Sequence, residues 1–481
     1  MISRLDAASV RKLRGAALLG CLTLVFTVLA AVPARALELT TYAYGNGRTG
    51  SAPGPAGISP GSATRLHIAW VASLAGAIDG QALVVNGVRA RRGKRIDLVL
   101  VATEHGEIAA LNLRDGGTVW KRWVGAHSIS PSCQASPDGV FGVTGTMVVD
   151  QVAGRVYAVD VNGRAWALSL ATGKPLKGWP VRVHLPGADF VWGGLALSKG
   201  WLYVPIASLC DRGRYYGGLK AVDTATPHRI LQWQTTAHSG AYAGGIWAWA
   251  GESIDGRTGD VFVATGNAIG GASESAGNAE QVIRLSAELK LKAHNYPLTP
   301  PFAITDRDFG STPVLFSATG CPSQLVATNK DGYLYRYNRY DISSGPRQSL
   351  QVAASTASSI PLLGMPAYDP GTRRMVLVSP TSTPGTLHAG IQSFVLGRRC
   401  NLVPSWQRGF DPPDAGSSPT IAGGVLFLGT GRNGVLRAYR LSDGQELWSQ
   451  GVGATNFDTP SVADGTVLDG TWAGQVWAFK P

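Results

Sequence analysis

The chain has 481 residues, of which 44% are hydrophobic and 15% are charged, and it contains 62 glycines and 28 prolines. This composition excludes a disordered chain and is typical of a protein built from many short strands and turns. The formal net charge is +12, but the basic residues are scattered apart from one cluster at residues 89–95, which we expect in a turn. The pattern therefore argues against a nucleic-acid-binding surface.

Residues 1–36 have the pattern of a secretory signal peptide. Four basic residues precede an apolar run over residues 15–32, and Ala34 and Ala36 are the small residues that a signal peptidase recognises. We expect cleavage after Ala36 and export to the periplasm or the cell exterior, which leaves a net charge of about +8 by loss of five basic residues and one acidic residue. An uncleaved anchor is the alternative, because about 18 apolar residues approach the length that spans a bilayer.

The exported part divides into an arm and one large domain. Residues 37–64 are rich in Gly, Pro, Ser and Thr and predict an extended N-terminal arm. Residues 65–74, RLHIAWVASL, form a lone predicted strand that carries Trp70. We expect residues 65–481 to form a single domain, because a repeated unit accounts for nearly all of them.

That unit is clearest at residues 434–448, GVLRAYRLSDGQELW, where an alternating strand, a polar glycine turn and a second strand end at Trp448. Similar segments occur at residues 107–120, 164–179, 219–233 and 392–406. Alternation with period 2 around a glycine turn predicts a β-hairpin. A hairpin repeated about every 40–60 residues predicts a propeller or a solenoid, with the Trp packed between neighbouring units.

The sequence predicts an all-β, eight-bladed propeller with four-stranded antiparallel blades, although seven blades are possible. The predicted units are residues 78–124, 140–183, 191–235, 242–286, 312–338, 363–406, 417–452 and 459–481. The last unit lacks its outer strand, and the strand around Trp70 has no unit of its own. We therefore expect the N- and C-terminal strands to share one blade, which removes a free sheet edge.

Four cysteines remain after the leader, at positions 133, 210, 321 and 400. An even number in an oxidising compartment allows two disulfides in three possible pairings. We favour Cys133 with Cys210 and Cys321 with Cys400, because these pairs would join adjacent units. No CxxCH motif is present to attach a haem.

Residues 244–267, GGIWAWAGESIDGRTGDVFVATGN, form the most informative stretch. The hairpins resemble the pyrroloquinoline quinone (PQQ) repeat, and this stretch resembles the part of quinoprotein alcohol dehydrogenases in which a Trp lies under the cofactor and a Gly-Asn ends a strand. The resemblance implies that Trp247 is the floor for the quinone and that Asn267 is a calcium ligand. Unlike the family, the chain has no adjacent Cys-Cys pair.

Other segments resemble family motifs in the same order along the chain. Residues 77–85 and 208–211 resemble the strand start and the Ser-Gly-Ala-Glu segment of the family. Residues 306–309 and 329–333 resemble its Asp-x-Trp-Asp and Lys-Asn-Gly-Phe segments. The resemblance implies the following roles: Asp79 and Ser208 contact the cofactor, Asp211 and Asp308 bind calcium beside Asn267, Asp308 is also the catalytic base, and Lys330 reaches the quinone oxygens.

The resemblance therefore implies an exported PQQ- and calcium-dependent oxidoreductase that acts on an alcohol or sugar hydroxyl and passes electrons to a separate acceptor. The alternative is a non-catalytic propeller scaffold for envelope assembly, which would bind a protein partner and no PQQ. Each site residue also has a structural interpretation, because a Trp can pack between blades, and Asn, Asp and Lys are common in turns.

Overall fold

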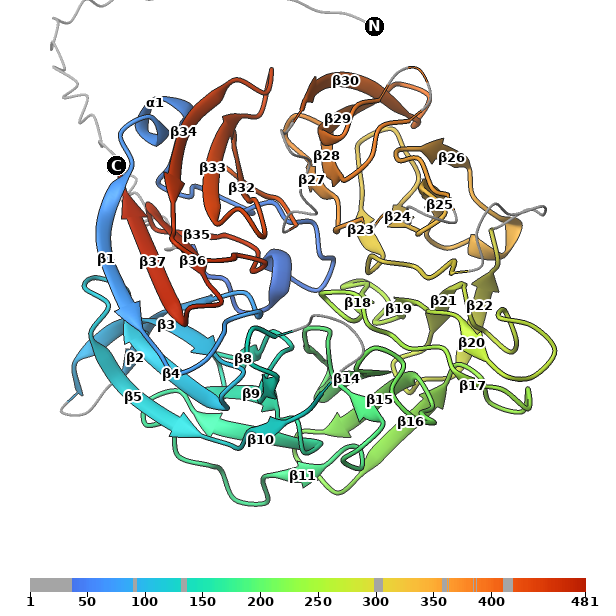
Figure 1. Ribbon diagram of the computed structural model, residues 1–481, viewed down its shortest axis with the longest axis horizontal. Coiled ribbons are helices and arrows are strands. Elements are labelled where there is room, and N and C mark those ends of the chain that lie inside the picture. The colour runs from blue at the N-terminus through green and yellow to red at the C-terminus, as the bar shows by residue number, and fades with distance from the viewer. Residues whose placement is uncertain are drawn as a thin grey trace, which may run out of the picture. The chain divides into compact units, whose positions relative to one another are not determined.

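The computed structural model pairs the alternating strands into antiparallel sheets arranged as the blades of a propeller (Figure 1). It describes residues 37–89, 93–130, 136–297, 306–356, 361, 363–383, 385, 387–409 and 418–481. The predicted signal peptide, its cleavage site and Cys133 lie outside these residues. No helix in the described ranges is both long and apolar enough to cross a membrane.

The described residues form eight blades, which confirms the predicted number. Blade 1 comprises β2 (Leu83–Arg89), β3 (Arg95–Ala102), β4 (Glu107–Asn112) and β5 (Thr118–Trp123), and blade 2 comprises β8 (Val148–Asp150), β9 (Arg155–Val159), β10 (Arg164–Ser169) and β11 (Val181–Arg182). Blade 3 comprises β13 (Ala196–Ser198), β14 (Trp201–Ser208), β15 (Gly218–Asp223) and β16 (Ile230–Gln234), and blade 4 comprises β18 (Ser253–Ile254), β19 (Val261–Ala264), β21 (Val282–Leu285) and β22 (Leu291–Asn295).

The remaining blades follow the same pattern. Blade 5 comprises β23 (Val314–Phe316), β24 (Gln324–Thr328), β25 (Tyr333–Asn338) and β26 (Gln348–Gln351), and blade 6 comprises β27 (Ala367–Asp369), β28 (Arg374–Ser379), β29 (Gly390–Leu396) and β30 (Leu402–Arg408). Blade 7 comprises β31 (Thr420–Ala422), β32 (Val425–Gly429), β33 (Val435–Arg440) and β34 (Glu446–Gly451), and blade 8 comprises β35 (Ser461–Ala463), β36 (Thr466–Gly470), β37 (Gln475–Lys480) and β1 (His67–Ser73). Short additional elements are β6 (His127–Ser128) with β7 (Val140–Phe141), β12 (Asp189–Phe190) on β14, β17 (Tyr242–Ala243) with β20 (Ala268–Ile269), and the 3-10 turn η3 (Ile342–Ser344).

The two ends of the chain close the ring as predicted. Strand β1 pairs antiparallel with β37, so that His67 lies opposite Lys480 and Ser73 lies opposite Gln475. Blade 8 is therefore built from both termini of the domain. This pairing covers the edge of β37 that would otherwise be exposed.

The unit boundaries predicted for blades 4 and 5 were too short. Their outer strands, β22 and β26, have the sequences LKAHN and QSLQ and carry no Trp. β22 is largely exposed and β26 is mostly half-buried, and neither shows the aromatic residue by which the other units could be recognised. The predicted limits at residues 286 and 338 therefore stopped one strand early.

The Trp of the repeat packs between neighbouring blades in a recurring arrangement. Trp70, Trp120 and Trp406 each donate the indole N–H to a carbonyl in the hairpin of the next blade, with N–O distances of 3.0, 2.7 and 2.9 Å. The glycine of that hairpin turn lies against the indole face, as Gly173 does against Trp120, where a Cβ would come within 2.4 Å of the ring. The spacing of Trp and Gly that recurs from one repeat to the next thus follows from one contact between blades.

The predicted disulfide between Cys321 and Cys400 is present. It joins the turn between β23 and β24 to the turn between β29 and β30, and so it links blades 5 and 6. Cys210 is also in a disulfide.

The N-terminal arm lies against the inner strands of the ring. It contains the 3-10 turn η1 (Tyr42–Tyr44) and the helical turn α1 (Pro60–Ala63), and the blue chain crosses the middle of the ring in Figure 1. Hydrogen bonds join the arm to the innermost strands of all eight blades, through Val84, Val149, Leu197, Ile254, Leu315, Tyr368, Ile421 and Val462. Between Leu39 and Ala52 the arm contacts blades 1 to 7 in order, while Tyr44 reaches blade 8.

Arg48 is the most deeply buried cation of the arm, with no exposed surface. Its guanidinium donates to the carbonyl oxygens of Glu252 at 2.9 Å and Leu195 at 3.1 Å, and to the Thr41 hydroxyl at 2.6 Å. These bonds tie the arm to blades 3 and 4.

We predict that Arg48→Ala lowers the free energy of unfolding by about 3 kcal/mol or more, because several buried acceptors lose a charged donor at once. Chemical denaturation measures the change. The control is Arg65→Ala, since the exposed Arg65 side chain bonds only Gly61 within its own turn, and we expect it to change stability by no more than about 0.5 kcal/mol. Equal effects of the two substitutions would contradict a central role for the arm.

We also predict that Gly173→Ala is more destabilising than Gly154→Ala. Both glycines have a positive φ, +65° and +66°, so each substitution carries a strain of about 1–2 kcal/mol. Only Gly173 lies against an indole, whereas a Cβ on Gly154 would meet no atom within 4 Å. We expect about 1–3 kcal/mol of additional loss for Gly173→Ala in the same denaturation measurement; equal losses would show that the Trp contact contributes nothing.

Candidate functional site

The predicted site residues lie at one face of the propeller. Each of them precedes an innermost strand, or ends or follows the second strand of a blade: Asp79, Ser208, Asp211, Trp247, Asn267, Asp308 and Lys330. Because the strands of a blade alternate in direction, these two kinds of connection meet at the same face of the ring. We call it the site face.

Lys330 is the centre of the strongest group of contacts on this face. Its ammonium lies 2.9 Å from both carboxylate oxygens of Asp306 and 3.1 Å from Oδ2 of Asp308. It also lies 5.1 Å from the centre of the Trp247 ring, within range of a cation–π interaction. Trp247, Asn267, Asp306, Asp308 and Lys330 are hereafter the Lys330 cluster.

Asp308 is held from two sides. Oδ1 accepts a short hydrogen bond from the backbone N–H of Asn267, and the backbone carbonyl accepts one from the N–H of Lys330 at 2.9 Å. The close approach requires Gly266, because a Cβ there would come within 3.0 Å of Asp308 Oδ1 and 3.3 Å of Trp247 Nε1. The Gly-Asn pair singled out in the sequence therefore makes room for the cluster and supplies a donor to it.

Burial and charge shift the proton affinities of this group. Burial raises the pKa of Asp308, an effect that Lys330 opposes and Asp306 reinforces. Burial alone would lower the pKa of Lys330, but the carboxylates of Asp308 and Asp306 outweigh it and raise that pKa. The raised pKa consequently favours the protonated, positively charged form of Lys330.

The indole N–H of Trp247 is a buried donor with no hydrogen-bond partner among the described residues. A donor without a partner at a buried position is unfavourable unless a ligand or water completes it. Together with the aromatic ring, this donor suits a planar ligand that can accept a hydrogen bond. These residues therefore fit a planar quinone, whose carbonyl oxygens are such acceptors.

The residues predicted to bind calcium do not fit that ion as they are arranged. One oxygen of Asp211 accepts a hydrogen bond from the Tyr215 hydroxyl at 2.7 Å, and both oxygens of Asp308 bond to Asn267 and Lys330. Within the described ranges, no group of three or more His, Cys, Asp or Glu side chains could hold a metal ion. Calcium prefers six to eight oxygen ligands, which this arrangement does not supply.

Tyr215 connects Asp211 to the cluster, and no motif in the sequence pointed to it. Burial raises its pKa, and the carboxylates of Asp211 and Asp308 raise it further, which places this phenol near both acids. Asp306 was also missed as a site residue, although it lies inside the motif that identified Asp308. Its two contacts with Lys330 depend on how the segment before β23 folds, which a motif does not specify.

Ser208 and Asp79 are not joined to the Lys330 cluster by any contact found in the described part of the chain. The Ser208 hydroxyl donates to the carbonyl of Arg212 at 3.0 Å and so shapes its own loop. Asp79 accepts a hydrogen bond from the indole of Trp472 at 2.7 Å, and it belongs to the seam between blades 8 and 1. The cluster itself comes from blades 4 and 5.

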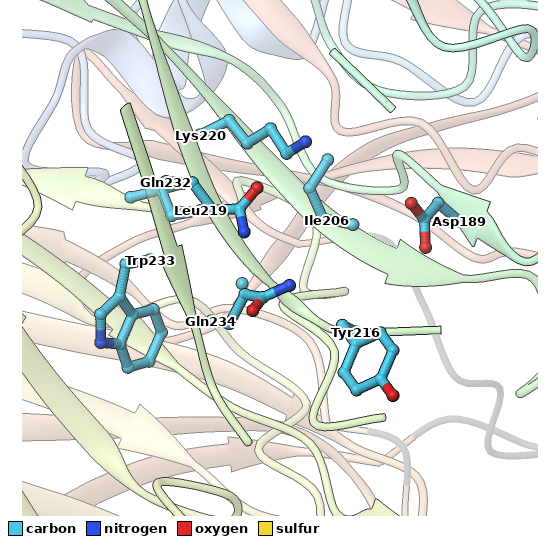
Figure 2. A pocket seen from close by; sticks show the side chains of 9 residues that line it. Asp189, Ile206, Tyr216, Leu219, Lys220, Gln232, Trp233 and Gln234 are labelled. Carbon is cyan, nitrogen blue, oxygen red and sulfur yellow. The ribbon is translucent and has the colours of Figure 1, made fainter. Parts of the chain in front are cut away.

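A hollow on blade 3 provides a contrast to the cluster (Figure 2). Asp189, Tyr216, Lys220, Gln232 and Gln234 line it together with apolar atoms of Ile206, Leu219 and Trp233. None of the predicted site residues lines this hollow, so it does not support the predicted chemistry.

Comparison with known proteins agrees with the fold. A family model described as outer membrane protein assembly factor BamB matches residues 58–205 and 403–481. No curated protein sequence matches the chain.

Solved structures of two kinds resemble it. The quinohemoprotein alcohol dehydrogenase of Comamonas testosteroni has a TM-score of 0.67 at 16% identity, over 92% of this chain and 80% of that one. A europium-containing methanol dehydrogenase has a TM-score of 0.66 at 14% identity, over 92% and 98% of the two chains. BamB from Moraxella catarrhalis has a TM-score of 0.54 at 14% identity, over 86% and 98%. With its Trp-linked hairpins closed into an eight-bladed ring, the chain has the fold of the quinoprotein alcohol dehydrogenase-like propellers.

Proposed function

We propose that the protein is an oxidoreductase that binds a PQQ-like quinone at the Lys330 cluster and oxidises a small alcohol or sugar hydroxyl. The observation that carries the proposal is the position of Lys330, whose ammonium is held by Asp306 and Asp308 beside the ring of Trp247. A purely structural lysine in a hairpin turn would not need two buried or half-buried carboxylates and an aromatic face.

Each residue of the cluster has a role that its environment supports. Trp247 offers an aromatic surface and an unpaired indole N–H to the ligand. Lys330 places a positive charge where negative charge develops, and Asp306 keeps that charge in position. Asp308 Oδ2 is the acceptor for the proton of the substrate hydroxyl, because burial raises its pKa above that of an ordinary Asp.

A bound quinone would supply the two-electron acceptor, which none of these side chains can provide. The structural similarity to alcohol and methanol dehydrogenases supports this choice of cofactor. Calcium was expected at Asp211, Asn267 and Asp308, but both oxygens of Asp308 and one oxygen of Asp211 already accept hydrogen bonds, and no step of the proposed chemistry depends on the ion. With no haem attachment motif in the sequence, electrons would pass to a separate acceptor.

A second candidate function is an envelope scaffold without cofactor. The family match to BamB and the structural similarity to BamB from Moraxella catarrhalis favour it. On this interpretation Asp306 and Asp308 would simply neutralise Lys330.

We further propose export with cleavage after Ala36. The leader pattern supports it, and so does the state of Leu37, which is buried and donates its backbone N–H to Asp464 Oδ1 at 2.9 Å. A chain that starts at Leu37 would thus begin at a residue that is already fixed to the turn between β35 and β36.

We predict that the protein starting at Leu37 binds PQQ and that Lys330→Ala weakens binding at least about tenfold, since a charge-assisted contact is worth about 1.5–3 kcal/mol. Titration calorimetry with PQQ, with and without Ca²⁺, measures the affinity. Asp308→Asn should retain binding and lower dye-linked alcohol oxidation by about 100-fold or more, because general-base catalysis contributes about 10²–10⁴-fold.

The control is Lys121→Ala, which removes a half-exposed lysine paired with Glu107 on the outside of blade 1. It should change neither affinity nor rate. No binding of PQQ by the unaltered protein at 100 μM, roughly a Kd above 10⁻⁴ M, would refute the enzyme and leave the scaffold as the remaining function.

A further inference from the structure

Four buried carboxyl groups lie where blade 8 meets blade 1. Asp79 precedes β2, Glu104 follows β3, Asp458 precedes β35 and Asp469 lies in β36. Their exposed fractions are 6%, 0%, 1% and 0%. Electrostatic interactions connect Asp469 with Asp458, Asp458 with Asp79, and Asp79 with Glu104, so the groups form a continuous row. We call these four residues the acid row.

Every member of the acid row has the same bonding pattern. One oxygen accepts a hydrogen bond from a neutral donor: the Trp472 indole for Asp79, the Gly142 N–H for Glu104, the Gly470 N–H for Asp458 and the Asn456 amide for Asp469. The other oxygen of each carboxyl has no partner among the described residues. The donors come from blades 2 and 8, and the bond from Trp472 of blade 8 to Asp79 of blade 1 crosses the seam at which the two ends of the chain close the ring.

No basic side chain neutralises the acid row. In the described part of the chain, none of the four carboxyls forms a salt bridge. Besides the donors above, the neutral hydroxyl of Thr144 interacts with Glu104, and Asp79 and Glu104 interact with each other. From the arm, Tyr42 faces Asp458, but its hydroxyl bonds Thr459 and burial raises its pKa to about 12. His105 follows Glu104 and is bonded to Asp138 instead.

Buried carboxylates without a cation are strongly disfavoured, and the usual outcome is protonation. Burial raises the pKa of all four groups. It places that of Asp469 at about 7, while the neighbouring acids raise those of Glu104 and Asp458 well above the usual range. A protonated carboxyl can donate to its neighbour, which gives the unpaired oxygens a partner.

We propose that the acid row is a proton-dependent latch: carboxyl groups that share protons hold blade 8 against blade 1 at the site face, and their ionisation loosens this seam. The latch acts where closure of the ring depends on the pairing of β1 with β37. It lies outside the Lys330 cluster and does not depend on the proposed enzymatic function.

The sign of the pH effect follows from proton linkage. In the unfolded chain these acids have ordinary pKa values of about 4, whereas in the folded protein they are raised. The folded state thus holds more protons between about pH 4 and the folded pKa values, and its stability falls as pH rises through that window. For each additional proton that the folded state binds relative to the unfolded state, the unfolding equilibrium constant rises about tenfold per pH unit.

We predict that the urea midpoint of the full mature protein falls between pH 6 and pH 8, with at least about a tenfold increase in the unfolding equilibrium constant. The double variant Asp458→Asn/Asp469→Asn, whose amides resemble protonated carboxyls, should show a smaller dependence; the remainder comes from Asp79 and Glu104 and from other buried acids with a raised pKa, such as Glu252 and Glu280. Hydrogen exchange, corrected for intrinsic pH effects, should show faster opening at pH 8 in β2 and β35–β37 than in β23–β26.

The matched control is Asp255→Asn. Asp255 is equally buried but is bonded to Arg339 at 2.9 Å and to the hydroxyl of Tyr340, and these partners lower its pKa to about 2 against the opposing effect of burial. This variant should be less stable at pH 6 and pH 8 alike, and the change of its urea midpoint with pH should equal that of the unaltered protein. If the double variant does not fold, Asp469→Asn alone should reduce the slope.

Two results would overturn the latch. One is a slope in the double variant equal to that of the unaltered protein. The other is restoration of the pH 8 midpoint by 1 mM Ca²⁺, roughly a concentration that occupies weak calcium sites, in the unaltered protein and not in the double variant; the row would then hold a cation instead of protons.

Discussion

Hydrogen bonds from the N-terminal arm to the inner edges of the blades are the constraint on which the rest of the propeller depends. The innermost strands are mostly two or three residues long, and each presents backbone groups toward the axis that its own blade cannot pair. One residue after another between Leu39 and Ala52 satisfies these groups, blade by blade. Buried backbone groups without partners are costly, so the arm replaces what longer inner strands would otherwise supply.

The two faces of the propeller therefore carry different features. The arm begins at Leu37, which is bonded to Asp464 in the turn between β35 and β36, on the face opposite the site face. The site face is left with the connections that carry the Lys330 cluster and the acid row. One group pairs its carboxylates with a lysine, while the other forms no salt bridge within the described residues and, in our proposal, holds protons instead.

Much of the fold was predictable because a single contact repeats. A Trp on an outer strand and a Gly in the next hairpin are both visible in the sequence, and their repetition predicted eight blades and the closure of β1 on β37. Where the Trp is absent, as in β22 and β26, the boundary was wrong. The arm was predicted as extended, but its sequence could not show which blades it contacts, because those bonds use backbone atoms that every residue has.

The sequence motifs predicted which residues of the site come together, but not which neighbours those residues bond. Trp247, Asn267, Asp308 and Lys330 are brought together as the motifs implied, since each ends or precedes a strand at the same face. What the motifs could not show is which neighbours use the bonding capacity of those residues. Asp306 accepts a hydrogen bond from Lys330, and Tyr215 donates one to Asp211. Both partners lie in segments whose conformation depends on the packing of the whole blade. A calcium site needs oxygens that are free as well as near, and that second requirement is decided by packing, because packing fixes which donor reaches each oxygen first.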